Sequence, residues 1–185
     1  MSTVFEKASI GTMQLQNRII RSATHEGYCR EDGGPVADKI VSLYRRLSEG
    51  GAGAIITGYC GVSRSGRAIK NMRMFDDDRF IEEYSGITGS LKQHGVPVIN
   101  QICHGGGFSS PDAVEGGVMA PSKVRDMTNN VVPREMSEED ILKVKDDFVA
   151  AIVRSKKAGF DGVQIHCAHG YLLCEFLSPA ANRRR

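Results

Sequence analysis

The sequence predicts an α/β protein whose strands pair in parallel through helical crossovers. One unit recurs along the chain: an apolar stripe at helical spacing, a glycine stop, and a short apolar run that ends in polar residues. A strand-like run over residues 18–22 precedes these units. Strands that alternate with helices pair in parallel through right-handed crossovers. The pattern alone leaves two architectures open, an open doubly wound sheet and a (β/α) barrel.

The clearest unit begins at Ser137. Ser137 with Asp140 matches a capping box, and the acidic residues of this turn suit the positive end of a helix dipole. Apolar residues then recur at helical spacing as far as Ser155, and Gly159 suits the left-handed position that follows a helix. We therefore expect a helix from Ser137 and a strand over residues 160–166.

The same unit occurs earlier in the chain. One copy has a helix that stops at a pair of glycines ahead of a strand over residues 54–57. Another starts its helix at residues 76–78 and continues, after a glycine, into a strand over residues 96–101. A small hairpin is expected over residues 10–15. No GxGxxG turn follows the first strand, so the dinucleotide-binding form of the doubly wound sheet loses its usual support.

Length and composition indicate one soluble globular domain. The chain has 185 residues, of which 41% are hydrophobic, and a formal net charge of +2, which calls for no nucleic-acid partner. No apolar run reaches the roughly 20 residues that span a bilayer, and no secretory signal pattern is visible, so no membrane partner is expected. The five cysteines contain no CxxC pair, which favours reduced thiols in a cytoplasmic protein.

One long segment departs from the alternation of helices and strands. Residues 104–133 are rich in glycine, proline and serine and connect the expected third strand to the Ser137 helix. Loops longer than about 15 residues in compact domains are usually functional or disordered. We expect this segment to be a long loop over the active-site face.

The richest stretch for chemistry covers residues 159–179. Alternation along a strand places Gln164 and His166 on the same face, and His169 and Tyr171 follow directly after the strand. Polar residues at the carboxyl end of a strand suit the active-site end of a parallel α/β fold.

A metal site at this strand end is not favoured. His166, Cys167 and His169 are metal-ligating residue types, but strand alternation directs Cys167 away from His166. No second ligand cluster with a recognised spacing occurs elsewhere in the chain. The sequence therefore predicts no metal.

Ordered motifs along the chain resemble those of the old yellow enzyme family of NADH:flavin oxidoreductases. They are LQNRIIRSAT at residues 15–24, IITGY at 55–59, VPVINQICHGG at 96–106, APS at 120–122, PREMS at 133–137 and GFDGVQIHCAHGY at 159–171. The resemblance covers essentially the whole chain. It implies a (β/α)8 TIM barrel of which residues 1–185 form the N-terminal half, with about the first four β/α units.

The resemblance also implies roles for individual residues. The FMN-facing residues would be Ala23, Thr24, His25, Gly58, Tyr59, Gln101 and His166. His166 and His169 would hold the substrate oxygen over the flavin, and Tyr171 would be the catalytic proton donor.

The implied reaction is the reduction of activated alkenes, which are α,β-unsaturated carbonyl or nitro compounds. NADH or NADPH would reduce FMN, flavin N5 would pass hydride to the β-carbon, and Tyr171 would protonate the α-carbon. Alternatives are an FMN-dependent amine dehydrogenase-like enzyme and a non-catalytic half-barrel.

Part of the family's machinery has no counterpart in this sequence. The Gly-rich phosphate-binding loops and any iron–sulfur cluster of longer relatives would lie beyond residue 185. We therefore expect the chain alone to bind FMN weakly or not at all and to be inactive. A second hypothesis is that two copies pair edge to edge as a homo-oligomer.

Overall fold

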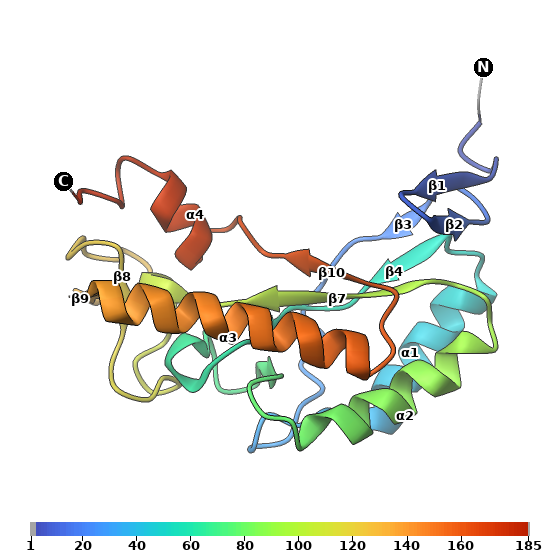
Figure 1. The fold of residues 1–185 in the computed structure, drawn as a ribbon, viewed down its shortest axis with the longest axis horizontal. Helices are drawn as coiled ribbons and strands as arrows, with labels where there is room; N and C mark the ends of the chain where they lie inside the picture. Colours follow the sequence, from blue (N-terminus) through green and yellow to red (C-terminus); the bar gives the residue numbers. More distant parts are fainter. Residues whose placement is uncertain (1–2, 185) are drawn as a thin grey trace.

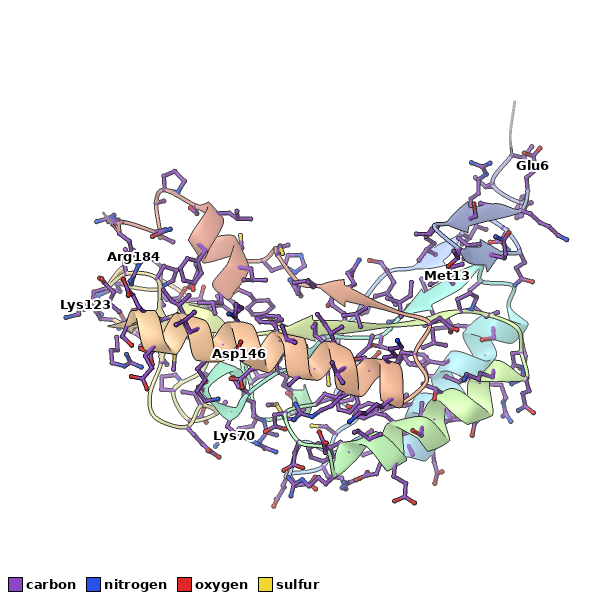
Figure 2. The ribbon with its side chains drawn as sticks, in the orientation of Figure 1. Glu6, Met13, Lys70, Lys123, Asp146 and Arg184 are labelled. Carbon is purple, nitrogen blue, oxygen red and sulfur yellow. The ribbon has the colours of Figure 1, made fainter. Side chains whose placement is uncertain are left out.

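The computed structural model describes residues 3–184, so the predicted domain, 1–185, exceeds the described part by residues 1, 2 and 185. A parallel sheet runs through the middle of the molecule, and three long helices lie along one side of it (Figure 1). The N-terminal hairpin and the short C-terminal helix lie at opposite ends of the sheet. Glu6 and Met13 mark the hairpin end, and Lys123 and Arg184 mark the other end (Figure 2).

The sheet contains the parallel strands that the sequence predicts, in sequence order across the sheet. They are β3 (Ile20–Arg21), β4 (Ala54–Ile56), β7 (Val98–Cys103) and β10 (Gly162–Ile165). Two short strands, β5 (Cys60–Gly61) and β6 (Arg73–Met74), extend the sheet beside the carboxyl end of β7. Within the described residues, β3 pairs only with β4, and β10 pairs only with β7.

The long helices form where the apolar stripes predict them. They are α1 (Ala37–Glu49), α2 (Phe80–Lys92) and α3 (Glu138–Lys157). The capping box at the start of α3 is confirmed, because the Ser137 hydroxyl accepts from the Asp140 amide and the Asp140 carboxylate accepts from the Ser137 amide. Gly159 has φ +80°, as predicted for the residue that ends this unit.

The predicted start of α2 at residues 76–78 is wrong by a few residues. The helix begins at Phe80, because Asp77 and Asp78 form a tight turn before it, in which their carbonyls accept from the amides three residues further on. Asp76 pairs with Arg64 at 2.6 Å, and Asp78 pairs with Arg154 of α3 at 2.7 Å. These partners are distant in sequence and leave no local signal.

The remaining elements are short. The predicted N-terminal hairpin is confirmed as β1 (Ala8–Ile10) and β2 (Met13–Leu15), which pair antiparallel. Residues 104–133 contain the turn η2 (Gly106–Phe108) and β8 (Met119–Ala120), which pairs with β9 (Arg134–Glu135). A further turn, η1 (Arg64–Gly66), follows β5, and α4 (Leu172–Leu177) ends the fold.

Two apolar clusters fill the space between the sheet and the helices. The larger contains Tyr44 of α1 and Tyr84 of α2, both fully buried, with the Phe75 ring 4.5 Å from that of Tyr84. The smaller joins Phe148 of α3 to Leu172 of α4. Burial of large apolar side chains is the main stabilising term in such a core. The core therefore fixes the helices on one side and leaves the carboxyl ends of the strands to form the site.

No helix between residues 3 and 184 combines the length and the apolar character needed to cross a membrane.

Candidate active site

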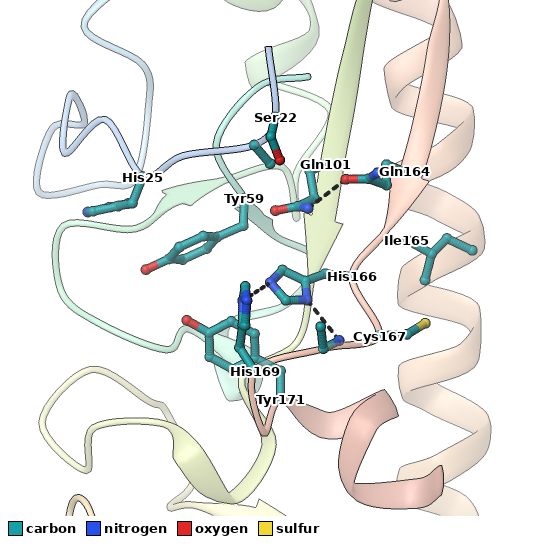
Figure 3. Close-up of a pocket in the computed structure, with 12 residues that line it drawn as sticks. Ser22, His25, Tyr59, Gln101, Gln164, Ile165, His166, Cys167, His169 and Tyr171 are labelled. Atoms are coloured by element: carbon teal, nitrogen blue, oxygen red, sulfur yellow. Dashed lines mark hydrogen bonds between the residues drawn. The ribbon is translucent and has the colours of Figure 1, made fainter. Parts of the chain in front are cut away.

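A pocket of about 480 Å³ lies at the carboxyl ends of β7 and β10 (Figure 3). Its lining residues come from four separate segments of the chain. They are Ser22, Ala23, His25, Tyr59, Gln101, Gln164, Ile165, His166, Cys167, Ala168, His169 and Tyr171. The pocket thus brings together seven of the residues predicted to act in catalysis or flavin binding: Ala23, His25, Tyr59, Gln101, His166, His169 and Tyr171.

Two imidazoles stand in contact at the end of β10. Nε2 of His166 lies 3.3 Å from Nδ1 of His169, and Nδ1 of His166 accepts from the Ala168 amide at 3.2 Å. The Ala168 contact makes Nδ1 of His166 the acceptor, so Nε2 carries the proton of the neutral ring. Burial and the neighbouring His169 lower the pKa of His166, which keeps the ring neutral. The Nε2–H of His166 is therefore directed at Nδ1 of His169, so the proton of a neutral His169 ring lies on its Nε2.

His169 has an unusual backbone. Its φ is +58°, in the left-handed region, and its side chain is exposed in the pocket mouth. Residues other than glycine rarely adopt this conformation, although Asn, Asp and His do so more often than others. Gly170, with φ +74°, continues the turn. The tight reversal brings the ring of His169 back against His166 and leads the chain directly to Tyr171.

Tyr171 stands at the start of α4, beside the histidine pair. Its ring is 4.8 Å from the His166 ring and 5.7 Å from the Tyr59 ring, measured between centroids. Burial raises the pKa of Tyr171. The hydroxyl is therefore protonated at neutral pH and is available as a proton donor.

Two glutamines form the floor between β7 and β10. Nε2 of Gln101 donates to Oε1 of Gln164 at 2.7 Å, and the two residues are direct partners in the parallel register. This bond leaves the amide oxygen of Gln101 without a partner from Gln164. The floor therefore offers amide groups, which donate and accept, to a polar heterocycle.

The wall opposite β10 is aromatic. His25 stacks on Tyr59, with 5.0 Å between ring centroids and 22° between planes. Nε2 of His25 is buried and has no hydrogen-bond partner among residues 3–184. Flat rings, an unpaired ring nitrogen and the amides of the floor fit a planar, polar cofactor such as the isoalloxazine of FMN.

Thr24 and Gly58, also predicted to face the flavin, do not line the pocket. The Gly58 amide donates to the Glu26 carboxylate at 2.8 Å, and its carbonyl accepts from Arg73 at 2.7 Å. The Thr24 hydroxyl donates to the carbonyl of Ser22. The flavin contacts of these two residues stay a prediction.

Behind Gly58 lies a buried charge cluster that the sequence did not reveal. The side chains of Glu26 and Arg73 are only 2% and 3% exposed, and they lie 3.4 Å apart. Arg21 approaches Glu26 at 3.5 Å, and the Tyr44 hydroxyl donates to the same carboxylate. Burial opposes ionisation of Glu26, but Arg73, Tyr44, the Gly58 amide and Arg21 outweigh it and lower its pKa. The cluster ties residues 24–26 to residues 58–59, the two segments that carry His25 and Tyr59.

Among residues 3–184, no group of three His, Cys, Asp or Glu side chains is placed to hold a metal ion.

Comparison with known proteins identifies a matching family. The model of the NADH:flavin oxidoreductase / NADH oxidase family matches residues 3–185. The chain is 36% identical to an NADPH dehydrogenase from Geobacillus thermodenitrificans, over 100% of this chain and 54% of that protein. It is 38% identical to a metal reductase from Desulforamulus reducens, over 100% of this chain and 27% of that protein. The chain thus spans about half the length, or less, of these curated relatives.

Solved structures agree in fold. An old yellow enzyme homologue from Zymomonas mobilis superposes with a TM-score of 0.89 at 27% identity, covering 99% of this chain and 53% of that one. Morphinone reductase superposes with a TM-score of 0.90 at 23% identity, a likeness that concerns the fold alone. The predicted resemblance, and the fold class of a partial (β/α) barrel, are confirmed.

Proposed function

Because the chain belongs to the NADH:flavin oxidoreductase / NADH oxidase family, we propose that it supplies the substrate-binding half of an FMN-dependent NAD(P)H oxidoreductase that reduces activated alkenes. One observation carries the proposal: His166, His169 and Tyr171 meet in one pocket beside an aromatic wall and an amide floor. The expected substrates are small α,β-unsaturated carbonyl or nitro compounds. The proposal involves no iron–sulfur cluster.

The residues proposed to hold FMN surround the pocket on three sides. Gln101 would bond the polar edge of the isoalloxazine, Tyr59 and His25 would form its aromatic neighbourhood, and Ala23 would approach through its backbone. Thr24 and Gly58 would complete the set through the segments that Glu26 holds together. When bound, FMN supplies the hydride.

The histidine pair would bind the substrate oxygen. The oxygen gains negative charge as the alkene is reduced, and N–H donors held in place stabilise that charge without rearrangement. The Ala168 amide and His169 hold the His166 ring, and a substrate oxygen would accept the N–H that His166 directs at His169 together with the Nε2–H of His169. Removal of one such donor typically costs about 10²–10³ in rate.

Tyr171 would protonate the α-carbon. Its hydroxyl keeps its proton at neutral pH because burial raises its pKa. Its ring lies 4.8 Å from that of His166, a position from which the hydroxyl would reach a substrate whose oxygen is bound by the histidines. General acid catalysis by a positioned group contributes about 10²–10⁴ in rate.

The test uses a completed barrel. Residues 1–185 are joined to the C-terminal half of the Geobacillus thermodenitrificans NADPH dehydrogenase, a relative of which this chain matches 54%. With FMN and NADPH, we expect reduction of 2-cyclohexenone, and a loss of about 10²–10³ in kcat/KM in the His166→Ala and His169→Ala variants. A chimera that binds FMN but oxidises an amine in place of reducing the enone would contradict the proposal and favour the amine dehydrogenase alternative.

A further inference from the structure

The short helix α4 is docked against the turn that follows β7. The Gly107 amide donates to the two carboxylate oxygens of Glu175 at 3.0 and 3.1 Å. The Leu172 amide donates to the His104 carbonyl at 3.1 Å. Both bonds join α4 to residues 104–107, which directly follow β7.

Both α4 and the turn contact Tyr171. The Glu175 amide donates to the Tyr171 carbonyl at 2.9 Å, so the two residues share the first turn of α4. Phe108, next to Gly107, packs its ring at 77° against Tyr171 with 5.5 Å between centroids. The position of the tyrosine ring therefore depends on how firmly the turn and α4 hold together.

The turn is shaped around the carboxyl group. A Cβ at Gly106 would lie 2.3 Å from one carboxylate oxygen of Glu175, and a Cβ at Gly107 would lie 2.7 Å from the other. Gly106 also has φ +61°, which disfavours a side chain there. Glycine at both positions lets the backbone close on Glu175.

We propose that Glu175 is a positioning residue for Tyr171, that its side chain holds the start of α4 on the turn through Gly107, and that ionisation of this carboxyl loosens the docking. The catalytic significance of this positioning rests on the role proposed above for Tyr171. The docking itself is a property of the chain without flavin or substrate.

Among residues 3–184, no Lys, Arg or His forms an ion pair with Glu175. Asp126, across the 104–133 segment, is the charged residue that acts on it, and the two repel as carboxylates. His104 is buried, and burial lowers its pKa to about 4, so it is neutral at physiological pH. On α4 itself, the only other titratable side chain is that of Cys174.

The sign of the pH effect follows from these surroundings. Burial first, and Asp126 in addition, raise the pKa of Glu175 to about 7, although the Gly107 amide lowers it. In an undocked α4 the carboxyl would return to its ordinary pKa, 4.5. Because the docked form holds the proton more tightly, docking is strongest below the ordinary pKa and weakens as the pH rises through about 7.

Nuclear magnetic resonance of the isotope-labelled chain tests this without activity. The backbone signals of Gly107 and Tyr171 are followed as the pH is raised from about 5 to about 9. We expect both to shift together with one midpoint near 7 in the unmodified chain. Glu175→Gln keeps an oxygen for the Gly107 amide but cannot ionise, so the Gly107 shift should disappear. Tyr171 should then keep only the shifts that the neighbouring His166 and His169 cause.

Two further variants make the result independent of any folding defect in Glu175→Gln. Asp126→Asn removes the repulsion and should lower the shared midpoint, whereas the exposed control Glu135→Gln should leave it unchanged. A Gly107 shift that Tyr171 does not follow, or a Gly107 midpoint that survives in Glu175→Gln, would overturn the inference. Shared titration together with a chimera that does not reduce the enone would leave the positioning intact and refute only the proposed function.

Discussion

At the residue scale, the site depends on one buried carboxylate that touches no substrate. Glu26 accepts from the Gly58 amide and lies beside Arg73 and Arg21, so it neutralises buried positive charge and fixes two pocket segments at once. Buried charges persist only when they are paired and hydrogen-bonded. His25 and Tyr59 stack because the backbones on either side of them are held by this group.

Replacement of Glu26 by Gln should be strongly destabilising. It leaves Arg73, which is 3% exposed, without a counter-charge, and loss of one partner of a buried pair typically costs about 3–5 kcal/mol. Denaturant unfolding of the chain measures the difference. Glu31→Gln, at an exposed position, is the matched control and should stay within about 0.5 kcal/mol of the parent.

The same group sets a pH dependence. The folded state lowers the pKa of Glu26 below its ordinary 4.5, so its stabilising contribution is present above that pH and is lost as the pH falls through the folded pKa. Unfolding free energy measured against pH should fall more steeply in acid for the parent than for Glu26→Gln. Parallel acid profiles would show that Glu26 is not the responsible group.

His169 should tolerate replacements according to backbone conformation. At φ +58°, Asn is acceptable, whereas a β-branched residue is strained by about 1–2 kcal/mol. Thermal unfolding should therefore place His169→Asn near the parent and His169→Val clearly lower. Equal stability of the two variants would mean that residue 169 is not held in the left-handed region.

At the element scale, the elements that local signals define were predictable. The helix α3 follows its capping box and its apolar stripe, and β7 and β10 follow apolar runs that end in polar residues. The start of α2 was misplaced because residues 77–81 form a tight turn with i→i+3 bonds, which an acidic run does not distinguish from the first turn of a helix. The short strands β5 and β6 were missed because two-residue strands exist only through their pairing with neighbours.

The capping box of α3 gives an element-scale prediction. Ser137→Ala removes the acceptor for the Asp140 amide, which lies 3.1 Å from the hydroxyl, and should cost about 0.5–2 kcal/mol. Denaturant unfolding measures the cost. Ser90→Ala, at an exposed position within α2, is the control and should change stability by less than about 0.5 kcal/mol.

The same distinction between local signals and long-range contacts applies to the residues of the site. His166, His169, Tyr171 and Gln101 stand at strand ends within recognisable motifs, so the sequence could place them together. Glu26 and Glu175 could not be found that way, because each matters through a bond to a glycine amide in a remote segment. A buried acid beside a required glycine is a tertiary relation, which periodicity does not encode.

At the scale of the whole molecule, the chain forms one side of a barrel-like sheet. Within residues 3–184, β3 and β10 each pair on one edge only, and apolar side chains such as Ile20 and Ile165 are 36% and 46% exposed there. Unpaired edges and exposed apolar residues favour association with further strands. The residues that line the pocket described above likewise all belong to this chain.

We therefore predict that the 185-residue polypeptide alone binds FMN weakly. The pocket supplies groups for the flavin ring, whereas phosphate is usually gripped in such barrels by the loops after the seventh and eighth strands. Quenching of flavin fluorescence during titration measures the affinity, and sub-micromolar binding would contradict the prediction. Sedimentation of the same sample shows whether copies pair edge to edge, because a clean monomer excludes that arrangement.

Single-turnover reduction of 2-cyclohexenone by the NADPH-reduced chimera and its Tyr171→Phe variant tests the role of the pocket. We predict that reduction of the flavin by NADPH is unchanged in the variant, while turnover of the enone is slowed by about 10²–10⁴. An enone step that proceeds at the parent rate without the Tyr171 hydroxyl would contradict the assignment of the pocket.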